Sequence, residues 1–192
     1  MTARRAVFLD RDGVLNRAIV RGGRPYPPQS LAELELTPGA QLACAALKQA
    51  GFWLIVVTNQ PDVARGAQSL DVVNDMNLWL QSELGLDDCR VCPHDDAEGC
   101  RCRKPEPGLL TSAAQQWNID LDESFMIGDR WRDVEAGARA GCRTVFLDFG
   151  YSEKRPVDPD YTTANLSDAA EWILAAGTTK DKLYEYALRN ES

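Results

Sequence analysis

The chain has 192 residues, of which 44% are hydrophobic, and a net charge of −8 at pH 7. That length suits one domain spanning residues 1–192, and the negative charge argues against nucleic acid or an anionic membrane surface as a partner. The apolar run near the N-terminus is too short for a signal peptide or a membrane span. We therefore expect a cytoplasmic, monomeric protein.

The first predicted element is a strand at residues 6–9 that runs into two carboxylates, Asp10 and Asp12, and then Gly13. Aspartates at positions i and i+2 do not suit one face of a packed strand, so we expect the strand to end at Asp10. An acidic pair on such a turn is either a charged surface turn or a hard-cation site that also supplies a nucleophile and an acid. The rest of the chain decides between the two.

Residues 17–36 are predicted to form a long basic loop, because the prolines and glycines within them break helices. A helix is expected next, with Thr37 as its N-cap, Pro38 in its first turn and Gly51 as its stop. Its predicted buried face consists of Leu42, Ala43, Ala46, Leu47 and Ala50.

The run 52–57 is continuously apolar, which is typical of a strand buried on both faces. Thr58, Asn59 and Gln60 follow where this strand stops. The next helix is predicted to be capped by Ser69 and to end at Gly85. Its predicted buried face consists of Leu70, Val73, Met76, Leu80 and Leu84.

Strands and helices alternate through the rest of the chain. The expected elements are a strand at 89–92, a loop at 93–106, a helix at 107–117, a strand at 124–127 ending in Gly128 and Asp129, a helix through Asp133 to residue 140, and a strand at 144–147. This alternation predicts an α/β, Rossmann-like three-layer sandwich with a mainly parallel sheet. Such sheets bind ligands at the carboxyl ends of their strands, where the polar residues gather.

Three cysteines and the single histidine lie close together, at Cys92, His94, Cys100 and Cys102. Three thiolates and one imidazole make a closed tetrahedral set, which indicates a structural zinc in loop 92–102. A reactive or disulfide-linked cluster is the alternative, and a cytoplasmic chain disfavours it. A zinc-stabilised loop would hold Arg103 and Lys104 without regular secondary structure.

The ordered motifs resemble those of the haloacid dehalogenase superfamily. They are Asp10-x-Asp12, the strand-ending Thr58, Lys104-Pro105 and Gly128-Asp129-x-x-x-Asp133. A narrower resemblance, to the heptose 1,7-bisphosphate phosphatases and the related histidinol-phosphate phosphatase domains, is carried by residues 10–16, 58–60 and 64–66 and by the cysteine loop. This chain departs from that pattern at Pro61 and Asp62 and in its proline-rich basic loop.

The resemblance implies a Mg²⁺-dependent phosphate monoester hydrolase with an aspartyl-phosphate intermediate. Asp10 would be the nucleophile and Asp12 the general acid, while Thr58 and Lys104 would contact the transferred phosphoryl group. The same resemblance implies a Mg²⁺ site made by Asp10, the main-chain carbonyl of Asp12, and Asp129, with Asp133 nearby.

The substrate expected from this resemblance is a small phosphorylated sugar, D-glycero-D-manno-heptose 1,7-bisphosphate, losing its 7-phosphate. Its predicted binding residues are Asn59, Gln60, Arg65, Arg103 and Arg21. The intervals between motifs are too short for an inserted cap domain, so a capless enzyme is expected. A histidinol-phosphate phosphatase and a catalytically idle zinc-binding module remain as alternatives. Leu183, Ala187 and Leu188 give the tail at 178–192 a helical spacing, which could dock on the body or mediate self-association.

Overall fold

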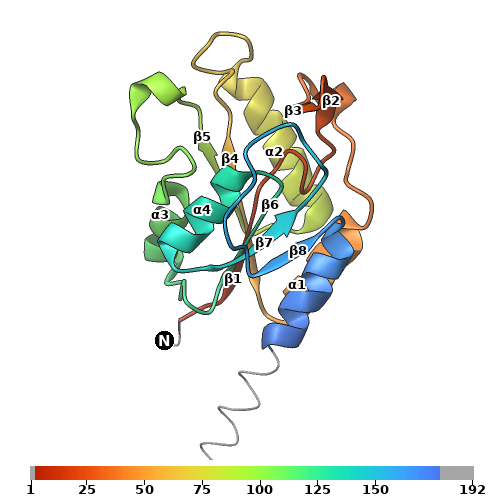
Figure 1. Ribbon diagram of the computed structural model, residues 1–192, viewed down its shortest axis with the longest axis vertical. Helices are drawn as coiled ribbons and strands as arrows, with labels where there is room; N and C mark the ends of the chain where they lie inside the picture. The colour runs from red at the N-terminus through yellow and green to blue at the C-terminus, as the bar shows by residue number, and fades with distance from the viewer. Residues whose placement is uncertain (1–2, 178–192) are drawn as a thin grey trace, which may run out of the picture.

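The computed structural model describes residues 3–177 and centres on one sheet of six strands, in the order β5-β4-β1-β6-β7-β8 (Figure 1). The strands are β1 (Ala6–Leu9), β4 (Trp53–Asn59), β5 (Asp88–Cys92), β6 (Phe125–Gly128), β7 (Arg143–Leu147) and β8 (Tyr161–Thr163). Every neighbouring pair in this sheet is parallel. The prediction of an α/β fold with a mainly parallel sheet is confirmed, and β1 lies inside the sheet with all its residues buried.

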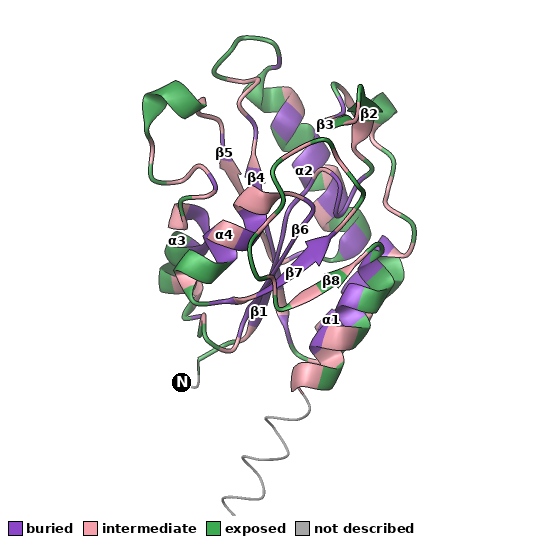
Figure 2. Ribbon diagram, viewed as in Figure 1, coloured by how far each residue is buried: buried purple, intermediate pink, exposed green. Residues whose placement is uncertain are grey.

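Helices cover both faces of the sheet, which gives three layers. On one face α1 (Ala40–Gln49), α2 (Leu70–Leu84) and the helical residues 166–177 pack against Val7 and Leu9. On the other face α3 (Gly108–Trp117) and α4 (Trp131–Ala140) pack against Ala6 and Phe8. Successive residues of a strand point to opposite faces, so an uninterrupted apolar run fills both cores. Figure 2 shows the buried residues concentrated between the layers.

The prediction of an irregular loop at 17–36 is wrong in part. β2 (Ile19–Arg21) and β3 (Arg24–Tyr26) form an antiparallel hairpin, and a short 3-10 helix, η1 (Leu31–Glu33), follows. The turn is made by Gly22 and Gly23, both with positive φ, as a two-residue hairpin turn requires. Pro25 is tolerated because an isolated two-stranded ribbon leaves outward-facing backbone positions that need no N–H.

Two helix details also differ from the prediction. The helix α1 begins at Ala40 behind Gly39, whose φ of 81° no side chain adopts easily, so Thr37 is not its N-cap. Leu42 is 78% exposed and Leu70 is 42% exposed, so neither belongs to a buried face. Ser69 does cap α2, accepting a hydrogen bond from Val72 N.

Beyond the predicted elements, the structure adds β8 and the helical segment 166–177. None of the helices within the described residues has the length and apolar character needed to cross a membrane. The tail at 178–192 lies outside the described residues.

Candidate active site

Four ionisable side chains meet at the carboxyl edge of the sheet. Asp10 follows β1, Asp129 follows β6, Asp133 lies in the first turn of α4, and Lys104 comes from the loop between β5 and α3. The ammonium Nζ of Lys104 lies 2.9 Å from Asp10 Oδ1 and 2.5 Å from Asp133 Oδ1. Burial opposes its charge, but the two carboxylates together raise the pKa of Lys104. The lysine is therefore a buried cation held between two of the three acids.

The three acids carry more negative charge than Lys104 balances. Burial and the nearby Asp133 carboxylate raise the pKa of Asp10 to about 6, although Lys104 lowers it. Burial, Asp10 and Asp133 raise the pKa of Asp129 well above its usual value. Both side-chain oxygens of Asp129 are buried, and among the described residues only the hydroxyl of Tyr151 is positioned to lower the pKa of this carboxyl by hydrogen bonding. Such crowding of buried carboxylates is relieved by a hard cation.

The loop after β1 is shaped to pass over Asp129. Gly13 has a φ of +93°, and a Cβ built on it would lie 1.9 Å from Asp129 Oδ2. Oxygen atoms of Asp10, Asp129 and Asp133 all lie within 4.8 Å of one another. Carboxylate oxygens are ligands that Mg²⁺ prefers, and the loop backbone at Gly13 passes close to Asp129. These three side chains could therefore hold that ion.

Asp12 is held by a dense set of donors. Arg11, which is fully buried, donates from Nε to Oδ1 (3.1 Å) and from Nη2 to Oδ2 (2.9 Å). Asn16 Nδ2 donates to Oδ1 (3.0 Å) and Gln60 Nε2 to Oδ2 (2.7 Å). Arg11 therefore has the structural role that its place between the two acids suggests. Gln60 is buried and orients Asp12 from behind the site.

The end of β4 connects the site to the loop that carries Lys104. Asn59 Nδ2 donates to the carbonyl of Lys104 (3.0 Å), and Lys104 N donates back to Asn59 Oδ1 (3.0 Å). Thr58 lines the cavity beside Asp10, and its hydroxyl accepts a hydrogen bond from Gln60 (2.9 Å). Asn59 thus acts on the backbone of Lys104 as a two-way clamp.

The Cys/His cluster predicted from the sequence is assembled in the structure. The sulfur atoms of Cys92, Cys100 and Cys102 lie 3.2 to 3.5 Å apart, and His94 Nδ1 lies 3.5 Å from Cys92 Sγ and 3.3 Å from Cys102 Sγ. All four offer a ligand atom within 4.8 Å, and the three thiols are free. The bond lengths of a tetrahedral zinc site set ligand atoms at roughly 3.5 to 3.8 Å from each other, so the cluster has the size of such a site.

A cavity of about 310 Å³ opens in front of Asp10 and Lys104. Its walls come from the hairpin, the loop after β4, the cysteine loop, the start of α4 and the segment after β7. The charged residues that line it are Asp10, Asp12, Arg24, Asp62, Arg65, Asp96, Arg103, Lys104, Arg130, Arg132, Asp133 and Glu153.

Most of the arginines around this cavity are already engaged by acids. Arg65 Nε lies 2.5 Å from Asp95 Oδ2. Asp96, in the short 3-10 helix η2 (Asp96–Glu98), pairs with Arg103 (2.7 Å) and Arg132 (3.1 Å). The carboxylates of Asp95 and Asp96 have lowered pKa values because these arginines donate hydrogen bonds to them.

The structure brings together most, but not all, of the predicted substrate-binding residues. Asn59, Arg65 and Arg103 line the cavity, whereas Gln60 lies behind it. Arg21 lies outside it, with its guanidinium 5.9 Å from the Tyr26 ring centre.

Arg24, on the same hairpin as Arg21, lines the cavity instead. Sequence reasoning also missed Arg130, Arg132 and Glu153. The two arginines lie inside the Gly128-Asp129-x-x-x-Asp133 motif, which was a usable signal, whereas nothing in the sequence marks Glu153.

Comparisons with known proteins place the chain among sugar phosphatases. A family model described as HAD-hydrolase-like matches residues 101–169. A D-glycero-beta-D-manno-heptose-1,7-bisphosphate 7-phosphatase of Rhodopseudomonas palustris is 38% identical over 151 residues, which cover 72% of this chain and 80% of that protein. One from Yersinia pestis is 34% identical, with 88% of this chain and 89% of that protein covered.

Solved structures give the same picture. A D,D-heptose 1,7-bisphosphate phosphatase from B. bronchiseptica, complexed with magnesium and phosphate, has a TM-score of 0.74 at 29% identity and covers 90% of this chain and 99% of that one. A HAD-like phosphatase from Mesorhizobium loti has a TM-score of 0.72 at 28% identity, with 92% and 87% covered.

Proposed function

We propose that this chain, a phosphoric monoester hydrolase that belongs to the haloacid dehalogenase superfamily, removes the 7-phosphate of D-glycero-D-manno-heptose 1,7-bisphosphate. Its relatives in that superfamily are the heptose-1,7-bisphosphate 7-phosphatases. The observation that carries the proposal is the contact of Lys104 with both Asp10 and Asp133, three residues that line one cavity of about 310 Å³. The names of the relatives support this substrate over histidinol phosphate, and the complete set of reactive side chains disfavours an idle zinc-binding module.

In the proposed first step, Asp10 attacks the phosphorus atom and the bond to the sugar oxygen breaks. Asp12 gives its proton to the leaving oxygen, as a general acid at hydrogen-bond distance would. Lys104 and the hydroxyl of Thr58 contact the transferring oxygens and stabilise the charge on them. The product of this step is an aspartyl-phosphate on Asp10 and a free sugar hydroxyl.

In the second step a water molecule attacks the phosphorus atom of the aspartyl-phosphate. Asp12, now ionised, takes the proton of that water, so inorganic phosphate leaves and both acids return to their starting states. Arg11, Asn16 and Gln60 keep the Asp12 carboxyl oriented through both steps.

Bound Mg²⁺ would neutralise the charge that two anions, a carboxylate and a phosphoryl group, bring together. The groups that would hold it are the side chains of Asp10 and Asp129 and the main-chain carbonyl of Asp12, with Asp133 nearby. A relative crystallised with magnesium supports the choice of metal, and the carboxylate of Asp129 supports the place.

Zinc is proposed as a structural ion of Cys92, His94, Cys100 and Cys102, and the protein is proposed to act as a capless monomer in the cytoplasm. Between β1 and α1 the structure has only the hairpin and η1, which supports the absence of a cap.

The test is phosphate release from the purified protein with Mg²⁺, comparing heptose 1,7-bisphosphate with histidinol phosphate. We expect the bisphosphate to have the higher kcat/KM and to lose one of its two phosphates. Higher kcat/KM for histidinol phosphate would overturn the substrate assignment.

Asp10→Asn tests the chemistry. Its amide has the same shape as the carboxylate but is not nucleophilic, so we expect kcat to fall by about three orders of magnitude or more with an unchanged circular dichroism spectrum. Asp71→Asn, at an exposed position on α2, is the matched control and should retain full activity. Retained turnover in Asp10→Asn would contradict the aspartyl-phosphate route.

A further inference from the structure

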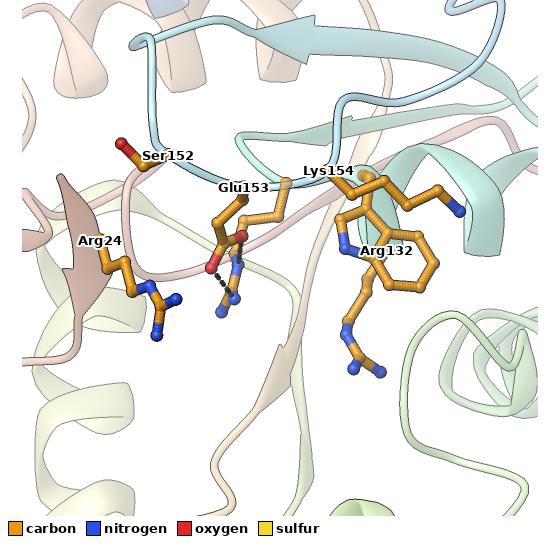
Figure 3. Close-up of a pocket in the computed structure, with 7 residues that line it drawn as sticks. Arg24, Arg132, Ser152, Glu153 and Lys154 are labelled. Atoms are coloured by element: carbon orange, nitrogen blue, oxygen red, sulfur yellow. Dashed lines mark hydrogen bonds and ion pairs between the residues drawn. The ribbon is translucent and has the colours of Figure 1, made fainter.

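A second compartment adjoins the catalytic cavity. Its volume is about 540 Å³, and Figure 3 shows the side chains around it. It shares Arg24, Arg130, Arg132 and Glu153 with the catalytic cavity. A substrate whose reacting end lies at Asp10 can therefore extend past these residues into the second compartment.

Among the cavity arginines, Arg24 differs from the others in its pairing. Arg130 makes two contacts with Glu153, from Nε to Oε2 (2.9 Å) and from Nη2 to Oε1 (2.5 Å). Arg132 pairs with Asp96, as described above. Within residues 3–177, Arg24 has no carboxylate within 4.0 Å, so a ligand can use its charge without breaking an existing ion pair.

Lys154, on the far wall, already has an acid and an aromatic ring beside it. Its Nζ lies 3.9 Å from Glu135 Oε2 and 4.1 Å from the ring centre of Trp131. The ammonium of Lys154 is therefore engaged by the indole ring of Trp131 as well as by Glu135. Arg24 is consequently the available cation at the junction of the two compartments.

The position of Arg24 is set by its hairpin. It is the first residue of β3, directly after Gly23, whose carbonyl accepts a hydrogen bond from Ser152 N (2.8 Å). A Cβ on Gly23 would lie 2.6 Å from Ser152 Oγ, so the turn and the segment after β7 are in close contact. In Figure 3 Arg24 extends from β3 toward Glu153, opposite Arg132. The ordered hairpin backbone therefore fixes where the Arg24 side chain begins beside the cavity.

We propose that Arg24 is a specificity-determining residue that binds the second, non-reacting phosphate of a sugar bisphosphate. The inference rests on the proposed function, since it takes the reacting phosphate to lie at Asp10 and Lys104. A hydrogen-bonded pair between a guanidinium and a phosphate remote from the reacting atoms orients the substrate and lowers KM.

The test compares Arg24→Gln with Arg21→Gln, a matched control on the same hairpin whose side chain lies outside the cavity. Both variants remove one exposed arginine, so the change in net charge is the same in the two. For heptose 1,7-bisphosphate we expect Arg24→Gln to raise KM about tenfold or more with little change in kcat. For p-nitrophenyl phosphate, which has no second phosphate, we expect both constants to stay within about twofold of wild type.

A second measurement uses the product. Heptose 1-phosphate keeps the phosphate assigned to Arg24, so its inhibition constant should rise in Arg24→Gln and stay unchanged in Arg21→Gln. Arg24→Lys should recover part of the lost affinity, because a charge returns without the planar fork of the guanidinium.

The outcomes separate this inference from the proposed function. In one outcome the wild type has a higher kcat/KM for the bisphosphate than for p-nitrophenyl phosphate, while Arg24→Gln keeps the same ratio and the same product inhibition. That result would overturn the role of Arg24 alone. An equal loss on both substrates would also overturn it. A wild type without preference for the bisphosphate would overturn both proposals.

Discussion

At the scale of single residues, the active site is a buried cluster in which the carboxylates outnumber the one lysine that contacts them. Lys104 contacts Asp10 and Asp133, while both side-chain oxygens of Asp129 are buried. Burial first, and then the neighbouring carboxylates, raise the pKa values of Asp10 and Asp129. A site of this kind is poised to accept a cation and a phosphoryl group together.

Gly13 gives a test of how closely the backbone must approach Asp129. In Gly13→Ala the new Cβ would collide with Asp129 Oδ2, at 1.9 Å, in a backbone conformation with a φ of +93°. We expect a loss of about 1–3 kcal/mol in the free energy of unfolding and a higher Mg²⁺ concentration for half-maximal activity. Thermal melting and a Mg²⁺ titration of phosphate release measure the two effects.

Gly51→Ala is the control for that experiment. Gly51 has a similar φ of +85°, and a Cβ there would meet no atom within 4 Å. It should therefore cost stability through backbone strain alone and leave the Mg²⁺ titration unchanged. If Gly13→Ala also leaves that titration unchanged, Asp129 does not take part in metal binding.

At the scale of elements, the end of β4 and the cysteine loop act as one unit. Strand pairing brings Asn59 beside Cys92, and the two hydrogen bonds of Asn59 then fix the backbone of Lys104. A residue that needs to be placed without a helix or strand of its own is thus fixed from two directions. One is the neighbouring strand, and the other would be the Cys/His cluster once it holds the proposed zinc.

Asn59→Ala should separate positioning from folding. Loss of two hydrogen bonds, at about 0.5–1.5 kcal/mol each, should lower the free energy of unfolding by about 1–3 kcal/mol. We expect kcat for p-nitrophenyl phosphate to fall about tenfold or more, because the ammonium of Lys104 would lose its fixed place. Asn165→Ala, exposed after β8, is the control. Unchanged kcat in Asn59→Ala would show that Lys104 needs no such clamp.

The zinc proposal makes a prediction of its own. Elemental analysis of the purified protein should give about one zinc per chain, since one four-ligand cluster binds one ion. Cys102→Ser should lower zinc content, melting temperature and activity together, because the loop that carries Lys104 would lose its anchor. Cys89→Ser, at a free thiol outside the cluster, should keep its zinc. A metal-free wild type with normal melting would contradict the proposal.

At the scale of the whole molecule, the sheet was predictable and the charge network was not. Strands β1, β4, β6 and β7 each contain a continuous apolar run that is followed by polar residues, a pattern typical of buried parallel strands. The ion pairs around the cavity join positions far apart in the sequence, such as Arg65 with Asp95 and Arg130 with Glu153. The sequence consequently does not reveal that these arginines are engaged by acids in the folded protein.

The hairpin and Leu42 show two further limits. Prolines in residues 25–28 indicate a loop, yet the paired glycines before them allow a ribbon whose strand includes Pro25. Leu42 has helical spacing to other apolar residues, but which of two adjacent faces is buried depends on packing that the sequence does not specify.

Metal binding should stabilise the entire fold, because the ligands come from both β1 and β6. Mg²⁺ at 100 times its dissociation constant should add about 2.7 kcal/mol to the free energy of unfolding if the ion binds the folded state alone. Thermal melting with and without Mg²⁺ measures this, and Asp129→Asn should remove most of the increase. EDTA should abolish phosphate release. An Asp129→Asn protein that keeps the full increase would place the ion elsewhere.

The segment that carries Arg24 is anchored at both of its ends. Arg17 N donates to Glu35 O (2.8 Å) and Thr37 N donates to Leu15 O (2.9 Å), so the chain leaves and re-enters the core at neighbouring points. The interior of such a segment can be lengthened, shortened or exchanged while its two junctions and the nearby carboxylates stay in place. Evolution, or a protein engineer, could therefore retarget this scaffold to other phosphate esters by swapping some twenty residues and leaving the reactive groups untouched.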